Sequence, residues 1–255
     1  MIPRRVLLAT PFGAAPFLVA AGPKPPLAAV PISRLQVAWW KARHEAKLAE
    51  LRARNPGLIF LGDSITQNWE QAGPQPWRNF APTWLRLYRT RNPVNLGFNG
   101  DATSHLLWRI TNGELDGIAP KAAVILIGAN NLGRLRWAAE DSIAGIVAVV
   151  AETRRRLPQT RLLLLGVLPS IRSDWTTAAT LAINAGLARR YGGTLVPNVT
   201  YLDIGHLFMK GSAVDPAQFY DPLLTPPEPP LHPTAMAQER LALAIEPTLA
   251  SLLSA

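Results

Sequence analysis

Short runs of consecutive apolar residues recur along the chain and predict the strands of a parallel sheet. Two of them, Leu58 to Leu61 and Leu162 to Leu168, are continuous and lack the polar alternation of a half-exposed strand, which is typical of central strands buried on both faces. The predicted strands are Leu58 to Leu61, Val94 to Gly97, Ala122 to Ile127, Leu162 to Leu168 and Val199 to Ile204. Helical segments of roughly ten to twenty residues separate them. The pattern therefore predicts a doubly wound α/β fold with a five-stranded parallel sheet.

The first predicted helix precedes the first strand and begins near a capping-box pattern formed by Ser33 and Gln36. Residues at helical spacing predict its buried face: Leu35, Trp39, Ala42, Ala46 and Ala49. His44 falls on the opposite, charged side and is expected to be exposed. A last helix is predicted from about Thr234, with an interruption near Pro247.

The first 29 residues have the character of an export signal. Arg4 and Arg5 precede an apolar stretch, and small residues before Gly22 offer a cleavage site. Pro11 and Pro16 within that stretch argue against a stable membrane-spanning helix. We therefore expect a periplasmic or secreted protein, with residues 30–255 forming one domain.

Composition narrows the possible chemistry. The chain has 255 residues, 48% of them hydrophobic, which suits one sizeable core. It has no cysteine, so disulfides, thiol nucleophiles and zinc–thiolate sites are excluded. A formal charge of +9 is compatible with nucleic-acid binding. The basic residues are scattered, however, and no binding motif accompanies them, so we expect a solvated basic surface and no nucleic-acid partner.

Three predicted strands end in small or polar residues instead of ordinary turns. These ends are Gly62-Asp63-Ser64, Asn99-Gly100-Asp101 and Gly128-Ala129-Asn130. In a parallel sheet such ends lie at one edge, where ligands bind. His232 precedes the last predicted helix. Attack on an ester requires a hydroxyl, a base and donors for the developing negative charge, and these segments contain all three.

Four blocks of the sequence resemble the GDSL, or SGNH, hydrolase family, and in particular its platelet-activating-factor acetylhydrolase catalytic-subunit type. The blocks are L-G-D-S-I-T, N-L-G-F-N-G-D-A-T-S-H-L-L-W-R-I-T-N-G-E-L, V-I-L-I-G-A-N-N and P-L-H-P-T. The resemblance implies a flavodoxin-like three-layer α/β/α sandwich, the SGNH hydrolase fold. It implies Ser64 as nucleophile and His232 as general base, with an oxyanion hole formed by the Ser64 and Gly100 N–H groups and the Asn130 amide. No metal or organic cofactor is expected.

The position of the acid that orients the histidine differs from the family pattern. The family has an Asp three residues before the histidine, where this chain has Pro229. The segment ending at Asp221 resembles the family's approach to its acid, so Asp221 is the favoured orienter, with a Pro-rich insertion after it. Glu228 is the rival, and a Ser–His dyad or a backbone carbonyl are further alternatives.

Other polar and aromatic residues near these strand ends have structural or functional interpretations. Asp63 and Asn131 are expected to brace their loops, and His105 to be packed or capping. Trp69 and Trp137 are candidates for stacking on a sugar. Arg134 and Arg136 follow the Asn130 loop and are either solvated or in contact with an acidic substrate.

The expected function is an exported serine esterase that hydrolyses small acyl esters, acetyl in particular, of a carbohydrate. One alternative is an O-acyltransferase acting on an exported polysaccharide. A second is a non-catalytic carbohydrate-binding protein, which Pro229 favours. The expected partner is a small-molecule or glycan ester, and the sequence does not predict an oligomeric state.

Overall fold

A computed structural model describes residues 24–193 and 196–254 and contains a five-stranded sheet in which all strands are parallel. The spatial order is β2-β1-β3-β4-β5, the flavodoxin-like order of a doubly wound sheet. The strands are β1 (Leu58–Gly62), β2 (Pro93–Gly97), β3 (Ala122–Leu126), β4 (Arg161–Leu165) and β5 (Val199–Leu202). The predicted fold class is therefore confirmed. A short antiparallel pair, β6 (Met209–Lys210) and β7 (Ala213–Val214), follows the sheet.

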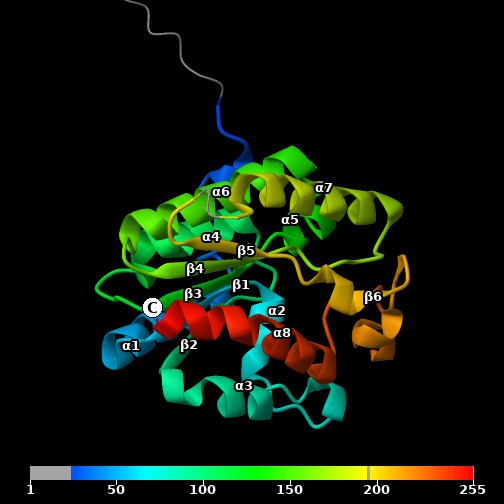
Figure 1. The fold of residues 1–255 in the computed structure, drawn as a ribbon, viewed down its shortest axis with the longest axis horizontal. Helices are drawn as coiled ribbons and strands as arrows, with labels where there is room; N and C mark the ends of the chain where they lie inside the picture. The colour runs from blue at the N-terminus through cyan, green and yellow to red at the C-terminus, as the bar shows by residue number, and fades with distance from the viewer. Residues whose placement is uncertain (1–23, 194–195, 255) are drawn as a thin grey trace, which may run out of the picture.

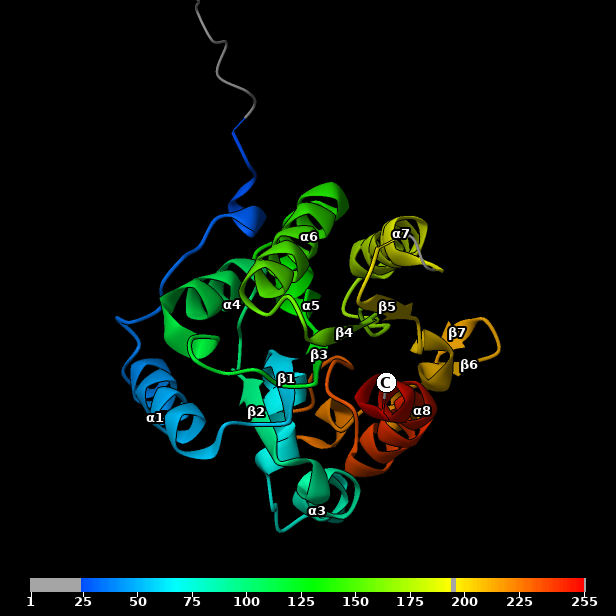
Figure 2. The same cartoon turned by 60° about the vertical axis from the view of Figure 1, so that its left-hand side comes forward.

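Helices cover both faces of the sheet, which lies between them as the middle layer (Figures 1 and 2). One face is covered by α1 (Ala38–Arg54), α4 (Thr103–Arg109), α6 (Ala139–Arg156) and α7 (Asp174–Tyr191). The other is covered by α3 (Ala81–Tyr88) and α8 (Ala235–Ser254). Two short helices, α2 (Ser64–Gln67) and α5 (Ala129–Gly133), directly follow β1 and β3. None of the described helices is both long enough and apolar enough to cross a membrane.

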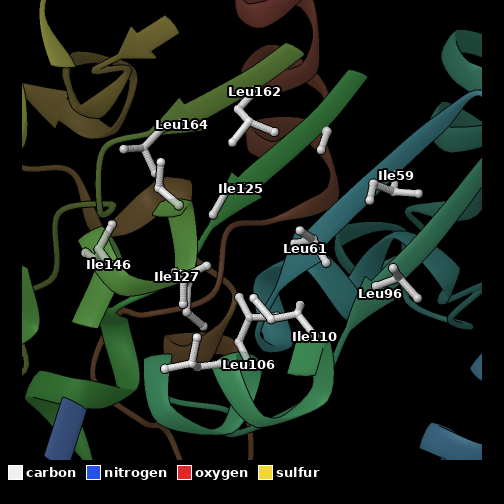
Figure 3. Close-up of a cluster of buried hydrophobic side chains, with 14 of the residues drawn as sticks. Ile59, Leu61, Leu96, Leu106, Ile110, Ile125, Ile127, Ile146, Leu162 and Leu164 are labelled. Carbon is white, nitrogen blue, oxygen red and sulfur yellow. The ribbon is translucent and has the colours of Figure 1, made fainter. Parts of the chain in front are cut away.

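Alternate strand residues contribute to two separate hydrophobic clusters, as a two-residue side-chain period requires. Ile59 and Leu61 point toward α4, where they join Leu106 and Ile110 (Figure 3). Phe60, between them, points to the opposite face. Because both faces are covered, strands β1, β2 and β3 are buried throughout, which explains the unbroken apolar runs of β1 and β3.

Strand β4 ends earlier than its apolar run predicts. Val167 and Leu168 remain buried, but Gly166 separates them from the ladder that ends at Leu165. The Asn184 side chain replaces the ladder there, accepting from the Val167 N–H at 2.9 Å and donating to its carbonyl at 3.0 Å. Val167 and Leu168 can therefore be buried although they lie outside the strand.

The predicted buried face of α1 is wrong. Trp39 is 45% exposed, and the buried positions are Trp40, His44, Lys47 and Leu51. His44 was expected to be exposed, yet its ring stacks on Trp40 and lies beside the buried Glu114. The helix starts at Ala38, and the predicted capping box does not form, since the Ser33 hydroxyl accepts from the nearby Leu35 N–H instead.

The last helix continues through Pro247, contrary to the predicted interruption. Pro247 lies on the solvent side of α8, as do Leu243 and Ala244. A proline removes one hydrogen bond within a helix. On this side water can bind the carbonyl that loses its partner, so the helix tolerates the residue.

The predicted export signal lies almost entirely in residues 1–23, outside the described residues. Leu27–Ala29, which the predicted boundary places in that segment, form a short 3₁₀ helix. Ala28 is fully buried, and its carbonyl accepts a hydrogen bond from the Thr103 hydroxyl at 2.8 Å. The chain is therefore packed on the domain from at least this point.

Candidate active site

Ser64 lies at the connection between β1 and α2. The strand ends at Gly62, and Asp63 caps the helix by accepting from the Ile65 N–H at 3.0 Å, as expected. A Cβ atom on Gly62 would lie 2.1 Å from the Thr66 hydroxyl oxygen, so only glycine permits this sharp connection. Ser64 is therefore held at the carboxyl edge of the sheet.

His232 and Asp221 join Ser64 in a continuous hydrogen-bonded chain. The Ser64 Oγ lies 2.9 Å from His232 Nε2, and His232 Nδ1 lies 2.5 Å from Asp221 Oδ1. An ionised carboxylate only accepts hydrogen bonds, so Nδ1 carries the proton. His232 Nε2 is then left to accept the hydrogen bond from the Ser64 hydroxyl.

The surroundings of Asp221 favour its ionised form. Its Oδ2 accepts from the backbone N–H groups of Leu231 at 2.7 Å and His232 at 2.6 Å. Burial by itself raises the pKa of Asp221, but the hydrogen bonds and charge of His232, together with these backbone donors, lower it overall. The carboxyl group is therefore a carboxylate held in one orientation.

Glu228, the rival acid, lies on the exposed side of the same loop. Its backbone N–H donates to the Asp221 carbonyl at 3.0 Å, whereas its side chain makes no hydrogen bond or ion pair with His232 among the described residues. The structure thus brings Asp221 to the imidazole and leaves Glu228 in solvent.

The loop between Asp221 and His232 is closed at its base. Phe219 pairs with Pro233 in an isolated antiparallel bridge, and the Tyr220 N–H donates to the His232 carbonyl at 2.9 Å. The Tyr220 ring stacks on the imidazole with 5.3 Å between centroids and 10° between planes. We call these contacts the neck of the loop. Residues 222–230 project beyond it, so the acid reaches the histidine despite their separation in sequence.

Gly100 lies in the loop after β2, and Asn130 lies in the first turn of α5 after β3; these two strands flank β1. Gly100 has a φ of +73°, which favours glycine. The Asn130 amide donates to the Asp101 carbonyl at 2.9 Å and so ties the two segments together. Across the described residues, the Gly100 N–H donates no hydrogen bond. This donor and the second Asn130 amide hydrogen are available to a ligand.

A buried charge network that the sequence reasoning missed supports the Gly100 turn. The Asp101 carboxylate, fully buried, accepts from Arg34 at 2.9 Å, Trp40 at 2.8 Å and Arg109 at 2.8 Å. Arg109, also fully buried, pairs with Glu114 at 2.5 Å. Asp101 and Arg109 both lie within the sequence block N-L-G-F-N-G-D-A-T-S-H-L-L-W-R-I-T-N-G-E-L, which resembles the family. Their position in this block is the feature of the sequence that could have indicated their role.

The other predicted residues have mixed outcomes. His105 caps α4 by accepting the Ala102 N–H at 3.0 Å, and Asn131 braces Thr103. Trp69 is wrong as a sugar platform, because it is 3% exposed and packs against Trp84 and Tyr88. Trp137 is half-buried.

Potential metal ligands do not cluster in the part of the chain that the structure describes. No group of three or more His, Asp or Glu side chains there could hold an ion.

Comparison with known proteins finds similar sequences and similar folds. Residues 60–240 match the model of the GDSL-like Lipase/Acylhydrolase family. The bovine platelet-activating factor acetylhydrolase IB subunit alpha1 is 36% identical over 130 residues, which are 51% of each protein. The match thus spans about half the length of this curated relative.

Solved structures show the same fold at low sequence identity. A GDSL-like lipase from Bacteroides thetaiotaomicron has a TM-score of 0.62 and 16% identity, covering 82% of this chain and 97% of its own. A carbohydrate acetylesterase from Sinorhizobium meliloti has a TM-score of 0.54 and 14% identity, covering 76% and 98%. At such identities the likeness concerns the fold alone.

Proposed function

The chain belongs to the GDSL-like lipase/acylhydrolase family, and on this basis we propose that it is a serine esterase that removes small acyl groups, in particular acetyl, from a carbohydrate. The observation that carries the proposal is the hydrogen-bonded chain of Ser64, His232 and Asp221. Nucleophile, base and orienting carboxylate have the order that acyl transfer requires. The 2.5 Å distance between Asp221 Oδ1 and His232 Nδ1 supports Asp221 in the orienting role despite Pro229, and so supports a catalytic protein.

In the acylation step the Ser64 oxygen bonds to the ester carbonyl carbon while its proton moves to His232 Nε2. The carbonyl oxygen becomes negative and is received by the Ser64 N–H, the Gly100 N–H and the Asn130 amide. When this intermediate collapses, the bond from carbon to the alcohol oxygen breaks. The proton on Nε2 then passes to the departing alcohol.

Deacylation repeats these transfers with water. His232 Nε2 takes a proton from water, whose oxygen bonds to the acyl carbon of the acyl-enzyme. The bond to the Ser64 oxygen breaks, and the proton returns to that oxygen as the carboxylic acid leaves. Throughout, the Asp221 carboxylate holds the His232 Nδ1 proton and stabilises the charged ring.

Two observations support a small acyl group and a carbohydrate alcohol. The bovine relative is named an acetylhydrolase and one structural neighbour a carbohydrate acetylesterase. Two exposed tryptophans, Trp39 and Trp175, each have a guanidinium group above one face of the ring, and the one above Trp39 belongs to Arg34, which also donates to the Asn99 carbonyl beside Gly100. Exposed aromatic rings provide flat surfaces on which sugar rings stack.

Hydrolysis of 4-nitrophenyl acetate by the full chain tests this function. We expect Ser64→Ala to lose at least about 10³-fold in kcat/KM, because the nucleophile is absent. Ser212→Ala, a matched change at an exposed residue near the β6–β7 turn, should keep the wild-type rate. Equal rates for wild type and Ser64→Ala would refute the proposal. Transfer of acetyl to an added sugar in preference to water would instead identify an acyltransferase.

We also propose that the protein acts after export, in the periplasm or outside the cell. The support is the sequence of residues 1–29, with its paired arginines and apolar stretch. Cell fractionation followed by N-terminal sequencing tests this proposal. Recovery of an uncut chain from the cytoplasm alone would contradict it.

A further inference from the structure

A guanidinium group covers the turn that contains Gly100. Arg134 directly follows α5, and its backbone N–H donates to the Asn130 carbonyl at 3.1 Å. A Cβ atom built on Gly100 would lie 2.3 Å from Arg134 Nη1, so the guanidinium group rests on this glycine. Within residues 24–193 and 196–254, the Arg134 side chain has no carboxylate partner and donates no hydrogen bond.

The other buried charges around this turn are compensated by one another. Arg34 and Arg109 share the Asp101 carboxylate, and Arg109 also pairs with Glu114. Two guanidinium groups therefore face two carboxylates. Neither of these two carboxylates pairs with Arg134, so its positive charge is not compensated by them.

His105, which caps α4 beside this turn, is not a second cation there. Its burial first, and then the charges of Arg34, Arg109 and Arg134, lower the pKa of His105 to about 4. This imidazole is therefore neutral near pH 7 and does not bind an anion. Arg134 offers a charge to solvent that no carboxylate among the described residues compensates.

The exposure of Arg134 separates it from the groups that receive the oxyanion. Ser64 and Asn130 are 6% and 4% exposed, and buried donors act strongly on charge that develops in the reaction. Arg134 is exposed, so water weakens its effect on the reacting carbonyl. Its position suits a charged part of the substrate that extends from the ester toward solvent.

We propose that Arg134 selects esters that carry a carboxylate near the reacting acyl group, as an acetylated uronic acid of an acidic glycan does. This inference rests on the proposed esterase function. A guanidinium group can bind a carboxylate through two parallel hydrogen bonds. Without residues 1–29 the chain has 23 basic and 17 acidic residues, and this formal charge of +6 also favours the approach of a polyanion.

The test compares two matched substrates, the 3-O-acetyl esters of methyl glucopyranoside and methyl glucopyranosiduronate. The second differs from the first only by its carboxylate. We expect wild type to favour it about two- to fivefold in kcat/KM at low salt, as a single well-oriented ion pair near the surface allows. This preference should fall toward one in Arg134→Gln and persist in part in Arg134→Lys. It should also fall for wild type in 0.5 M NaCl, because salt screens exposed charges.

Arg89→Gln is the charge-matched control, because Arg89 is exposed just before β2, at the opposite edge of the sheet. It should keep the wild-type preference. Equal losses on both sugars in Arg134→Gln would place Arg134 on the ester itself and overturn the inference. Equal wild-type rates on the two sugars, with Ser64-dependent hydrolysis of 4-nitrophenyl acetate intact, would overturn this inference alone. Absence of that hydrolysis would overturn the esterase proposal as well.

Discussion

Replacing Asp221 with asparagine tests the assignment of the orienting acid, since neither orientation of the new amide reproduces the carboxylate. If its oxygen faces His232 Nδ1, its NH₂ group meets the backbone N–H groups of Leu231 and His232, which lie 2.7 and 2.6 Å from Asp221 Oδ2. Two buried donors then lose their acceptor, at about 1–3 kcal/mol each. If the amide is flipped, both backbone bonds survive, but the NH₂ group donates to Nδ1.

The flipped orientation is the more stable one, and it moves the imidazole proton to Nε2. That nitrogen then faces the Ser64 oxygen as a donor and cannot take the serine proton. We therefore expect Asp221→Asn to lose about 10³- to 10⁴-fold in kcat. The free energy of unfolding should fall by no more than about 1–2 kcal/mol, because the backbone bonds remain.

The assay combines kcat for 4-nitrophenyl acetate, urea denaturation and ¹⁵N chemical shifts of His232, which distinguish its tautomers. Glu228→Gln is the control, because Glu228 is exposed and has no bond to His232. It should keep wild-type kcat. More than a tenth of wild-type kcat in Asp221→Asn, with the Nδ1–H tautomer retained, would refute the reasoning. Loss of activity in Glu228→Gln alone would assign the role to Glu228.

Two further variants test the strand ends. Burial raises the pKa of Asp63 to about 6, so the folded state binds this proton more tightly than the unfolded state does. Stability is therefore lost as the pH rises from about 4, where Asp63 ionises in the unfolded chain, to about 6, and the loss is complete above that pH. Asp63→Asn should therefore be more stable than wild type at pH 8, by up to about 3 kcal/mol in urea denaturation, with no gain below pH 4. A gain that is the same at both pH values would contradict this. Asn130→Ala removes an oxyanion donor and should lower kcat about 10²- to 10³-fold with little change in KM, whereas a change confined to KM would exclude that role.

The sheet and its functional edge follow from local sequence. Strands buried on both faces produce unbroken apolar runs such as Leu58 to Leu61, and such runs are visible without knowledge of their neighbours. The carboxyl ends of parallel strands share one edge, so Ser64, Gly100 and Asn130 could be placed together before any coordinates were known.

The buried face of α1 could not be predicted in this way. His44 and Lys47 are polar, and their burial depends on carboxylates that are distant in sequence, Glu114 for His44 and Glu70 for Lys47. Trp69 was misplaced for a related reason, since its burial depends on the packing of α3. Periodicity describes one helix at a time, whereas these contacts join several elements.

Because of the neck formed by Phe219, Tyr220, His232 and Pro233, the relative positions of Asp221 and His232 depend little on the length of the loop over residues 222–230. The contacts that align the acid and the base lie at the neck and at the adjacent Leu231, and Glu228 adds a backbone bond to the Asp221 carbonyl. The exposed residues 225–227 can therefore be lengthened or exchanged without removing these contacts. Evolution therefore has a site, close to the catalytic histidine, where insertions are compatible with activity. For protein engineers, the same segment is a place to graft new substrate-binding loops onto an unchanged catalytic centre.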